Sequence, residues 1–163
     1  MSAAGPLVIR AAVTAADMQT ARELFLEYAE WLQIDLCFQG FAEELSTLPG
    51  AYAPPAGRLL LAEQGSAAGC VALRRLAVDA TGAACELKRL WVRSGFRGRL
   101  VGRALAESAL AAARAIGYRR MKLDTVPAIM PAAVALYREL GFTDCAPYYH
   151  SPIPGSLYME CAL

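Results

Sequence analysis

Residues 83–117 restrict the fold most, because a strand pattern there passes through a loop rich in glycine and arginine into a helix pattern. Residues 83–92 (AACELKRLWV) have the composition of a strand. Residues 118–125 (YRRMKLDT) also have the composition of a strand. Gly117, directly before them, is a typical residue to end a helix. The intervening helix, 101–116, is indicated by residues with helical spacing at Val101, Leu105, Ser108, Ala112 and Ile116. This order predicts a β-α-β unit.

The rest of the chain adds helices and strands before and after this unit. A first helix is predicted at 14–32, where Thr14 and Asp17 have the spacing of a capping box. A short helix is expected at 42–48, and a last one at 131–140, which begins with Pro131. The remaining strands are predicted at 6–13, 58–63, 68–76, 142–145 and 157–163. The order predicts a mixed α/β sheet with helices on both faces, built as one domain from residues 1–163.

Composition and charge exclude several classes of protein. The formal net charge is +1, which argues against a nucleic-acid-binding face. The apolar runs are too short to span a bilayer, and the N-terminal residues lack the pattern of a signal peptide. The five cysteines are scattered, without metal-ligand spacing, so we expect reduced thiols, no metal and a cytoplasmic location. We expect Cys70, Cys85 and Cys161 to be buried packing residues.

The loop between the strand and the helix is the candidate for binding chemistry. Five arginines fall between positions 89 and 103, and glycines occur at 95, 98 and 102. A helix N-terminus preceded by such a loop can bind phosphate groups through its main-chain amides, with arginine adding charge-assisted hydrogen bonds. An ordinary solvated turn has the same composition. The spacing fits neither a Walker loop nor a dinucleotide-binding fingerprint.

The segments LWVRSGFRGRLVGRALAESAL and LYRELGF together resemble the GCN5-related N-acetyltransferases, the GNAT family, at their correct separation. The resemblance covers nearly the whole chain. It implies a mostly antiparallel sheet of six or seven strands, with a cleft where the strands 83–92 and 118–125 splay apart. It also implies acetyl-CoA as co-substrate and a primary amine as acceptor, with direct acetyl transfer in a ternary complex.

The resemblance also assigns cofactor residues. The family signature [RQ]-x-x-G-x-[GA], whose amides hold the CoA pyrophosphate, falls on residues 97–102, and the pantetheine arm would pair with the edge of the strand 83–92. The implied set is Leu90, Trp91, Val92, Arg97, Gly98, Arg99, Leu100, Val101, Gly102 and Arg103. Two positions depart from the family pattern. Leu100 replaces a glycine, and Met130 stands where an asparagine often contacts the pantetheine or a water, with Asp124 and Thr125 as nearby polar residues.

Two residues are implied for proton transfer. Tyr137, in LYRELGF, takes the place of the family's general acid, although its neighbours Leu136 and Leu140 also make it a candidate for the core. Glu86 lies where many family members carry a glutamate that acts as the general base, directly or through a water molecule. The alternative for Glu86 is an exposed carboxylate paired with Lys88 or Arg89.

Aromatic residues in two irregular segments are candidates for an acceptor pocket: Trp31, Phe38, Tyr148, Tyr149 and His150. The acceptor is expected to be a small-molecule or peptide amine, with no nucleic-acid or membrane partner, and a homodimer is conceivable. Two alternatives to an N-acetyltransferase stay open at this stage. One is a non-catalytic acyl-CoA-binding module, and the other is an interaction domain in which the arginines only solvate a turn.

Overall fold

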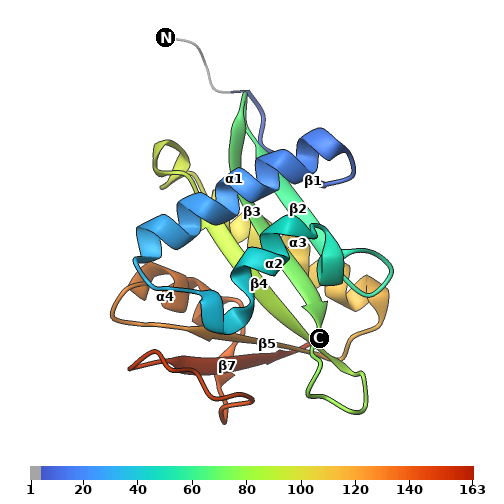
Figure 1. The fold of residues 1–163 in the computed structure, drawn as a ribbon, viewed down its shortest axis with the longest axis vertical. Coiled ribbons are helices and arrows are strands. Elements are labelled where there is room, and N and C mark those ends of the chain that lie inside the picture. The colour runs from blue at the N-terminus through green and yellow to red at the C-terminus, as the bar shows by residue number, and fades with distance from the viewer. Residues whose placement is uncertain (1–4) are drawn as a thin grey trace.

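The structure is a computed structural model that describes residues 5–163, apart from the side chain of Phe38. It contains four α-helices and seven strands in the order shown in Figure 1. The helices are α1 (Ala15–Leu32), α2 (Phe41–Ser46), α3 (Val101–Ile116) and α4 (Pro131–Glu139). The strands are β1 (Val8–Ala11), β2 (Arg58–Glu63), β3 (Ala67–Arg75), β4 (Ala84–Val92), β5 (Arg120–Thr125), β6 (Thr143–Asp144) and β7 (Leu157–Ala162).

The strands form one sheet in the order β1-β2-β3-β4-β5-β7-β6. Every neighbouring pair is antiparallel except β4 and β5, which α3 connects as the predicted β-α-β unit. Helices α1 and α2 cover the face nearer the viewer in Figure 1, and α3 lies behind the sheet. The prediction of a mostly antiparallel mixed sheet with helices on both faces is confirmed. Among the described helices, none is both long and apolar enough to cross a membrane.

Strand alternation divides the core into two clusters, one on each face of the sheet. On β2, Leu59 and Leu61 pack in the cluster under α1, whereas Leu60 packs in the larger cluster under α3 and α4. On β4, Cys85 and Leu87 belong to the cluster under α3 and α4, so Glu86 and Lys88 project toward α1 and α2. This alternation determines from which face of the sheet the Glu86 and Lys88 side chains project.

The predicted helix boundaries are close to the observed ones because local capping determines them. The Thr14 side chain accepts a hydrogen bond from the Asp17 amide at 3.1 Å, and the Asp17 carboxylate accepts one from the Thr14 amide at 3.0 Å. This is the expected capping box. Pro131 opens α4, and Gly117 ends α3 with a φ of +109°, which favours glycine.

Two details of the prediction are wrong. Strand β1 spans only Val8–Ala11, not 6–13, because only these four residues pair with β2. The buried stripe of α3 is also rotated from the predicted one. Ser108, Ala112 and Ile116 are only half-buried, and the sheet instead covers a wider face: Val101, Leu105, Ala106, Ala109, Leu110 and Ala113. The many alanines in this helix make several faces compatible with the same spacing.

Candidate active site

Strands β4 and β5 separate after three residue pairs, and this opens the sheet at its centre. Their pairing runs from Ala84 with Arg120 to Glu86 with Lys122 and then ends, although β4 continues to Val92. Beyond Lys122, β5 pairs only with β7. The edge of β4 that faces β5 is therefore free from Leu87 onward, as expected for a splayed cleft.

A β-bulge lies on the same free stretch of β4. Cys70 pairs with Trp91 and Ala72 with Lys88, so Arg89 and Leu90 together oppose the single residue Val71. Arg89 has a φ of +61°, an uncommon conformation for a residue with a side chain. The extra residue shifts the alternation, so that Lys88 and Arg89 both project toward the side of α1 and α2.

The Arg89 side chain anchors the bulge to α2. It is only 2% exposed and forms a bidentate ion pair with Glu44, at 2.8 and 3.0 Å. Its guanidinium also lies 5.1 Å from the centre of the Phe41 ring. The expectation that Arg89 belongs to an anion-binding cluster is thus not met, because a buried carboxylate already neutralises it.

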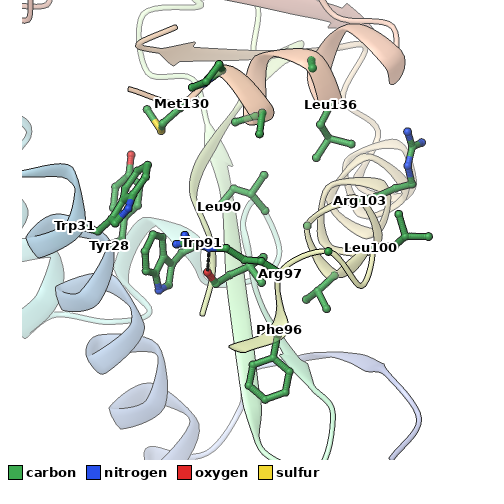
Figure 2. Close-up of a pocket in the computed structure, with 18 of the residues that line it drawn as sticks. Tyr28, Trp31, Leu90, Trp91, Phe96, Arg97, Leu100, Arg103, Met130 and Leu136 are labelled. Atoms are coloured by element: carbon green, nitrogen blue, oxygen red, sulfur yellow. Dashed lines mark hydrogen bonds between the residues drawn. The ribbon is translucent and has the colours of Figure 1, made fainter. Parts of the chain in front are cut away.

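Beside the free edge of β4 lies a cleft of about 630 Å³, shown in Figure 2. We call it the cofactor cleft, after the residues that the sequence predicts to bind a cofactor. Its lining is mostly apolar, and it runs between the end of α1, the strand β4, the loop before α3, and α4. It brings together nine of the ten residues predicted for the cofactor: Leu90, Trp91, Val92, Arg97, Gly98, Leu100, Val101, Gly102 and Arg103. Arg99 does not line it and lies at the surface, with its guanidinium 5.8 Å from the centre of the Phe96 ring.

The N-terminus of α3 presents unpaired main-chain donors to this cleft. The first helical hydrogen bond runs from the Ala104 amide to the Leu100 carbonyl at 3.0 Å, which leaves the amides of residues 101–103 without helical partners. No side chain caps this end. These donors and the helix dipole favour an anionic group here.

The arginines around the loop differ in whether a carboxylate already neutralises their charge. Arg93 is paired with Glu27 on α1 at 2.7 Å, and Arg103 is paired with Glu139 on α4. Arg97 forms no ion pair within the described residues. Its Nε donates to the Val92 carbonyl at 3.1 Å, and its guanidinium lies 4.9 Å from the centre of the Trp91 ring (Figure 2). Arg97 and Arg99 are therefore the two side chains of this loop whose charge is free to meet an anion.

Leu100, which replaces the signature glycine, adopts a conformation that favours glycine. Its φ is +62°, and its side chain is 71% exposed at the N-cap of α3. A left-handed conformation costs a residue with a side chain about 1–2 kcal/mol. The chain therefore has a leucine in a backbone conformation that favours glycine, the residue of the family signature at this position.

The family resemblance implies that acetyl-CoA binds here, so replacing Leu100 with glycine should tighten acetyl-CoA binding several-fold and raise the free energy of unfolding by no more than about 1.5 kcal/mol. The relieved strain of about 1–2 kcal/mol is offset by the greater freedom of glycine in the unfolded chain, about 0.5–1 kcal/mol. Calorimetric titration of acetyl-CoA measures the first effect. Leu100→Ala is the matched control, since it removes the terminal isopropyl group but keeps the strained Cβ. Equal affinities of wild type and Leu100→Gly would show that the leucine does not obstruct the cofactor.

A second hollow of about 50 Å³, the inner pocket, passes through the gap between β4 and β5. Successive residues of β5 line it: Leu123, Asp124 and Thr125. Helices on both faces of the sheet contribute to its lining as well, with Tyr28 from α1 and Tyr137 from α4. It shares Tyr28, Leu90, Met130 and Ala133 with the cofactor cleft, so the two adjoin.

Tyr137 lies in this inner pocket, projecting from α4. Its side chain is 7% exposed, and its ring packs 5.6 Å from that of Phe142, so it is both a core residue and a pocket residue. Burial raises the pKa of the Tyr137 hydroxyl well above its usual value. The hydroxyl therefore stays protonated at neutral pH.

A third hollow of about 380 Å³, the outer pocket, lies on the side of α2 and shares Gln39 and Lys88 with the inner pocket. Glu86, Tyr148 and Tyr149 line it, which brings three of the predicted residues together. Glu86 is 3% exposed and is not paired with Lys88 or Arg89, the partners that the alternative interpretation gave it. Its partner is Arg74, the cross-strand neighbour on β3 at 3.0 Å.

Of the other residues predicted for the acceptor, Trp31 and His150 do not line this pocket. Trp31 lines the cofactor cleft, where its ring lies 5.4 Å from that of Trp91. Phe38 falls in the 3-10 turn Cys37–Gln39, and its side chain lies outside the described part of the structure. His150 is exposed and lines none of the three hollows. Met130 lies where the cofactor cleft meets the inner pocket, offering a thioether in place of the family's amide.

Sequence reasoning did not place Arg74 or Gln39 at the site, and it named Asp124 only as a polar residue near Met130. One signal was available, since Glu86, Lys88 and Arg89 are three charged residues inside an otherwise apolar strand.

Comparison with known proteins agrees with this geometry. The family model described as the acetyltransferase (GNAT) family matches residues 13–142. An uncharacterized N-acetyltransferase of Schizosaccharomyces pombe is 38% identical over 146 residues, which cover 88% of this chain and 87% of that protein. A protein of Azospirillum brasilense named IAA acetyltransferase is 38% identical over 110 residues, covering 66% of this chain and 69% of its own length.

Solved structures show the same fold. A GNAT-family acetyltransferase from Staphylococcus aureus Mu50 superposes with a TM-score of 0.77 at 18% identity, over 96% of this chain and 99% of that one. The structure of yncA from Salmonella typhimurium, a putative acetyltransferase described with its cofactor acetyl-CoA, superposes with a TM-score of 0.67 at 19% identity, over 96% and 93%. The chain belongs to the GNAT family of acetyltransferases. It is an acyltransferase of a family that uses acetyl-CoA.

Proposed function

We propose that this protein transfers the acetyl group of acetyl-CoA directly to the primary amine of a small acceptor, with both substrates bound together. The observation that carries the proposal is the gap between β4 and β5. Beside it lie a long apolar cleft, lined from α1, β4, the loop before α3 and α4, and a polar pocket on the side of α2. Two substrates entering through these two hollows would meet in the inner pocket between them, where proximity lowers the barrier to transfer.

The donor substrate fits the cofactor cleft in its chemistry. The amides at the start of α3, together with Arg97 and Arg99, would hold the pyrophosphate. The free edge of β4 at Leu90, Trp91 and Val92 would pair with the amide groups of the pantetheine arm as an added strand does. The thioester would then lie at the inner pocket.

The residues of the inner pocket supply the proton for the leaving group. The amine attacks the thioester carbonyl, the C–N bond forms, and the C–S bond breaks. Tyr137 would give its proton to the departing CoA thiolate, and a second proton from the new amide nitrogen would restore the tyrosine. The narrow inner pocket admits only the amine end of the acceptor, while its body stays in the outer pocket, whose volume suits a small molecule.

Release of free CoA thiol, followed with a panel of primary amines, tests the proposal. We expect release that requires both acetyl-CoA and at least one amine, with intersecting initial-velocity lines when both substrates are varied. Binding of acetyl-CoA without turnover on any amine would instead identify a non-catalytic acyl-CoA-binding module.

A further inference from the structure

Two carboxylates, Glu86 and Asp124, lie close to the gap in the sheet, and they differ in how many of their oxygens are occupied. The Glu86 Oε1 accepts from Arg74 Nε at 3.1 Å and pairs with Nη2 at 3.0 Å, and its Oε2 accepts from the Tyr148 hydroxyl at 2.6 Å. Both oxygens are therefore engaged by strong donors. Glu86 lines the outer pocket and not the inner one.

Asp124 lines the inner pocket, and only one of its two carboxylate oxygens accepts a hydrogen bond. Its Oδ2 accepts from the Tyr149 hydroxyl at 2.6 Å. Its Oδ1 lies 3.8 Å from Lys88 Nζ, beyond hydrogen-bond distance, and the Lys88 ammonium donates instead to Gln39 Oε1 at 3.3 Å. Within residues 5–163, Oδ1 thus has no hydrogen-bond donor, although the side chain is only 12% exposed.

A second polar group of the same pocket also lacks a partner. The Thr125 side chain is buried at 3% exposure, and its Oγ1 makes no hydrogen bond to any described residue. A buried hydroxyl without a partner is unfavourable, so such groups in folded proteins usually meet a water or a ligand. Thr125 and Asp124 are consecutive and line the same pocket. The inner pocket therefore suits a polar group of a ligand better than an apolar one.

From these contacts we infer that Asp124, not Glu86, binds the ammonium group of the acceptor and removes its proton. This inference rests on the proposed function. The ammonium would donate to Oδ1, one proton would pass to the carboxylate, and the nitrogen lone pair would then be free to attack the thioester carbon. The proton leaves Asp124 for solvent through the outer pocket. The overall reaction converts an ammonium and acetyl-CoA into an amide, CoA thiol and one proton.

The groups around Asp124 determine the electrostatic environment in which it would take the proton of the acceptor. Those facing it come from four elements: Lys88 on β4, Tyr149 in the segment before β7, Tyr28 on α1 and Tyr137 on α4. Burial lowers the pKa of Lys88 and raises the pKa of Tyr149. The Lys88 ammonium and the Tyr149 hydroxyl both lie against the Asp124 carboxylate, where each would stabilise a negative charge on it.

Asp124→Asn tests the inference, because asparagine keeps the shape of the side chain and cannot take the proton. The measurements are acetyl-CoA affinity by calorimetry, and kcat and KM for the best amine as functions of pH. We expect unchanged acetyl-CoA affinity, a kcat lower by about 10²–10⁴-fold, a higher KM for the amine, and loss of the acidic limb of the pH–rate profile. Glu86→Gln is the matched control and should keep that acidic limb.

Tyr149→Phe keeps the inference testable should Asp124→Asn fail to fold. It removes one hydrogen bond to Oδ2 and should shift the acidic limb of the pH–rate profile to higher pH, because the charged carboxylate loses a donor. Asp124→Asn with wild-type kcat and pH profile would overturn the inference and leave the proposed function intact. An unshifted profile in Tyr149→Phe would overturn it as well. A wild-type protein that binds acetyl-CoA but acetylates no amine would overturn the proposed function itself.

Discussion

Replacing Glu44 with alanine should lower the free energy of unfolding by about 3–5 kcal/mol, although Glu44 lies outside the three hollows. The reason is that the Arg89 guanidinium, 2% exposed, would keep its charge in the core without a carboxylate. Removing one partner of a buried pair costs more than the pair contributes. Urea unfolding followed by fluorescence measures the loss.

Glu43→Ala is the matched control for this change. Glu43 lies next to Glu44 in α2, is exposed, and forms no side-chain ion pair in the described structure. We expect its replacement to change stability by less than about 0.5 kcal/mol. Equal losses for the two variants would show that the cost comes from α2 and not from the buried pair. The double variant Arg89→Met with Glu44→Leu should recover much of the lost stability.

Replacing Tyr137 with phenylalanine should reduce kcat by about 10²–10⁴-fold and leave acetyl-CoA affinity unchanged. The phenyl ring keeps the packing against Phe142, whereas the proton donor for the CoA thiolate is lost. The raised pKa of the Tyr137 hydroxyl keeps that donor protonated across the neutral range. Steady-state thiol release, together with calorimetric titration of acetyl-CoA, separates the chemical step from binding.

Tyr28→Phe is the control for Tyr137, because Tyr28 lines the same inner pocket from the opposite side of the sheet. We expect a smaller effect on kcat there. An unchanged kcat in Tyr137→Phe would exclude the acid role. A large loss of kcat in Tyr28→Phe alone would assign the acid role to Tyr28 on α1.

The sequence predicted most elements because their limits depend on local chemistry. The capping box of Thr14 and Asp17, Pro131 at the start of α4 and Gly117 at the end of α3 each act over a few residues. The β-α-β unit followed from the order of elements, and the arginine- and glycine-rich loop indicated an anion site at its junction. The family resemblance then added the splayed cleft.

What the sequence did not predict depends on contacts between distant segments. The bulge at Arg89 is set by pairing with β3 and by Glu44, 45 residues away, and it changes which side of the sheet Lys88 and Arg89 face. The partner of Glu86 is Arg74, across the strand pair, and not a neighbour in sequence. Trp31 was assigned to the acceptor by its residue type, whereas the length of α1 brings it to the cofactor cleft.

Thermal unfolding with and without excess acetyl-CoA tests most directly the claim that this cleft binds the donor substrate. A ligand present at about 100 times its dissociation constant adds about 2.7 kcal/mol, which raises the Tm of a domain of this size by roughly 5–10 °C. We predict such a rise with acetyl-CoA, and none of that size with ATP or NADH, which lack the pantetheine arm. The same Tm with all three ligands and without any would contradict the account.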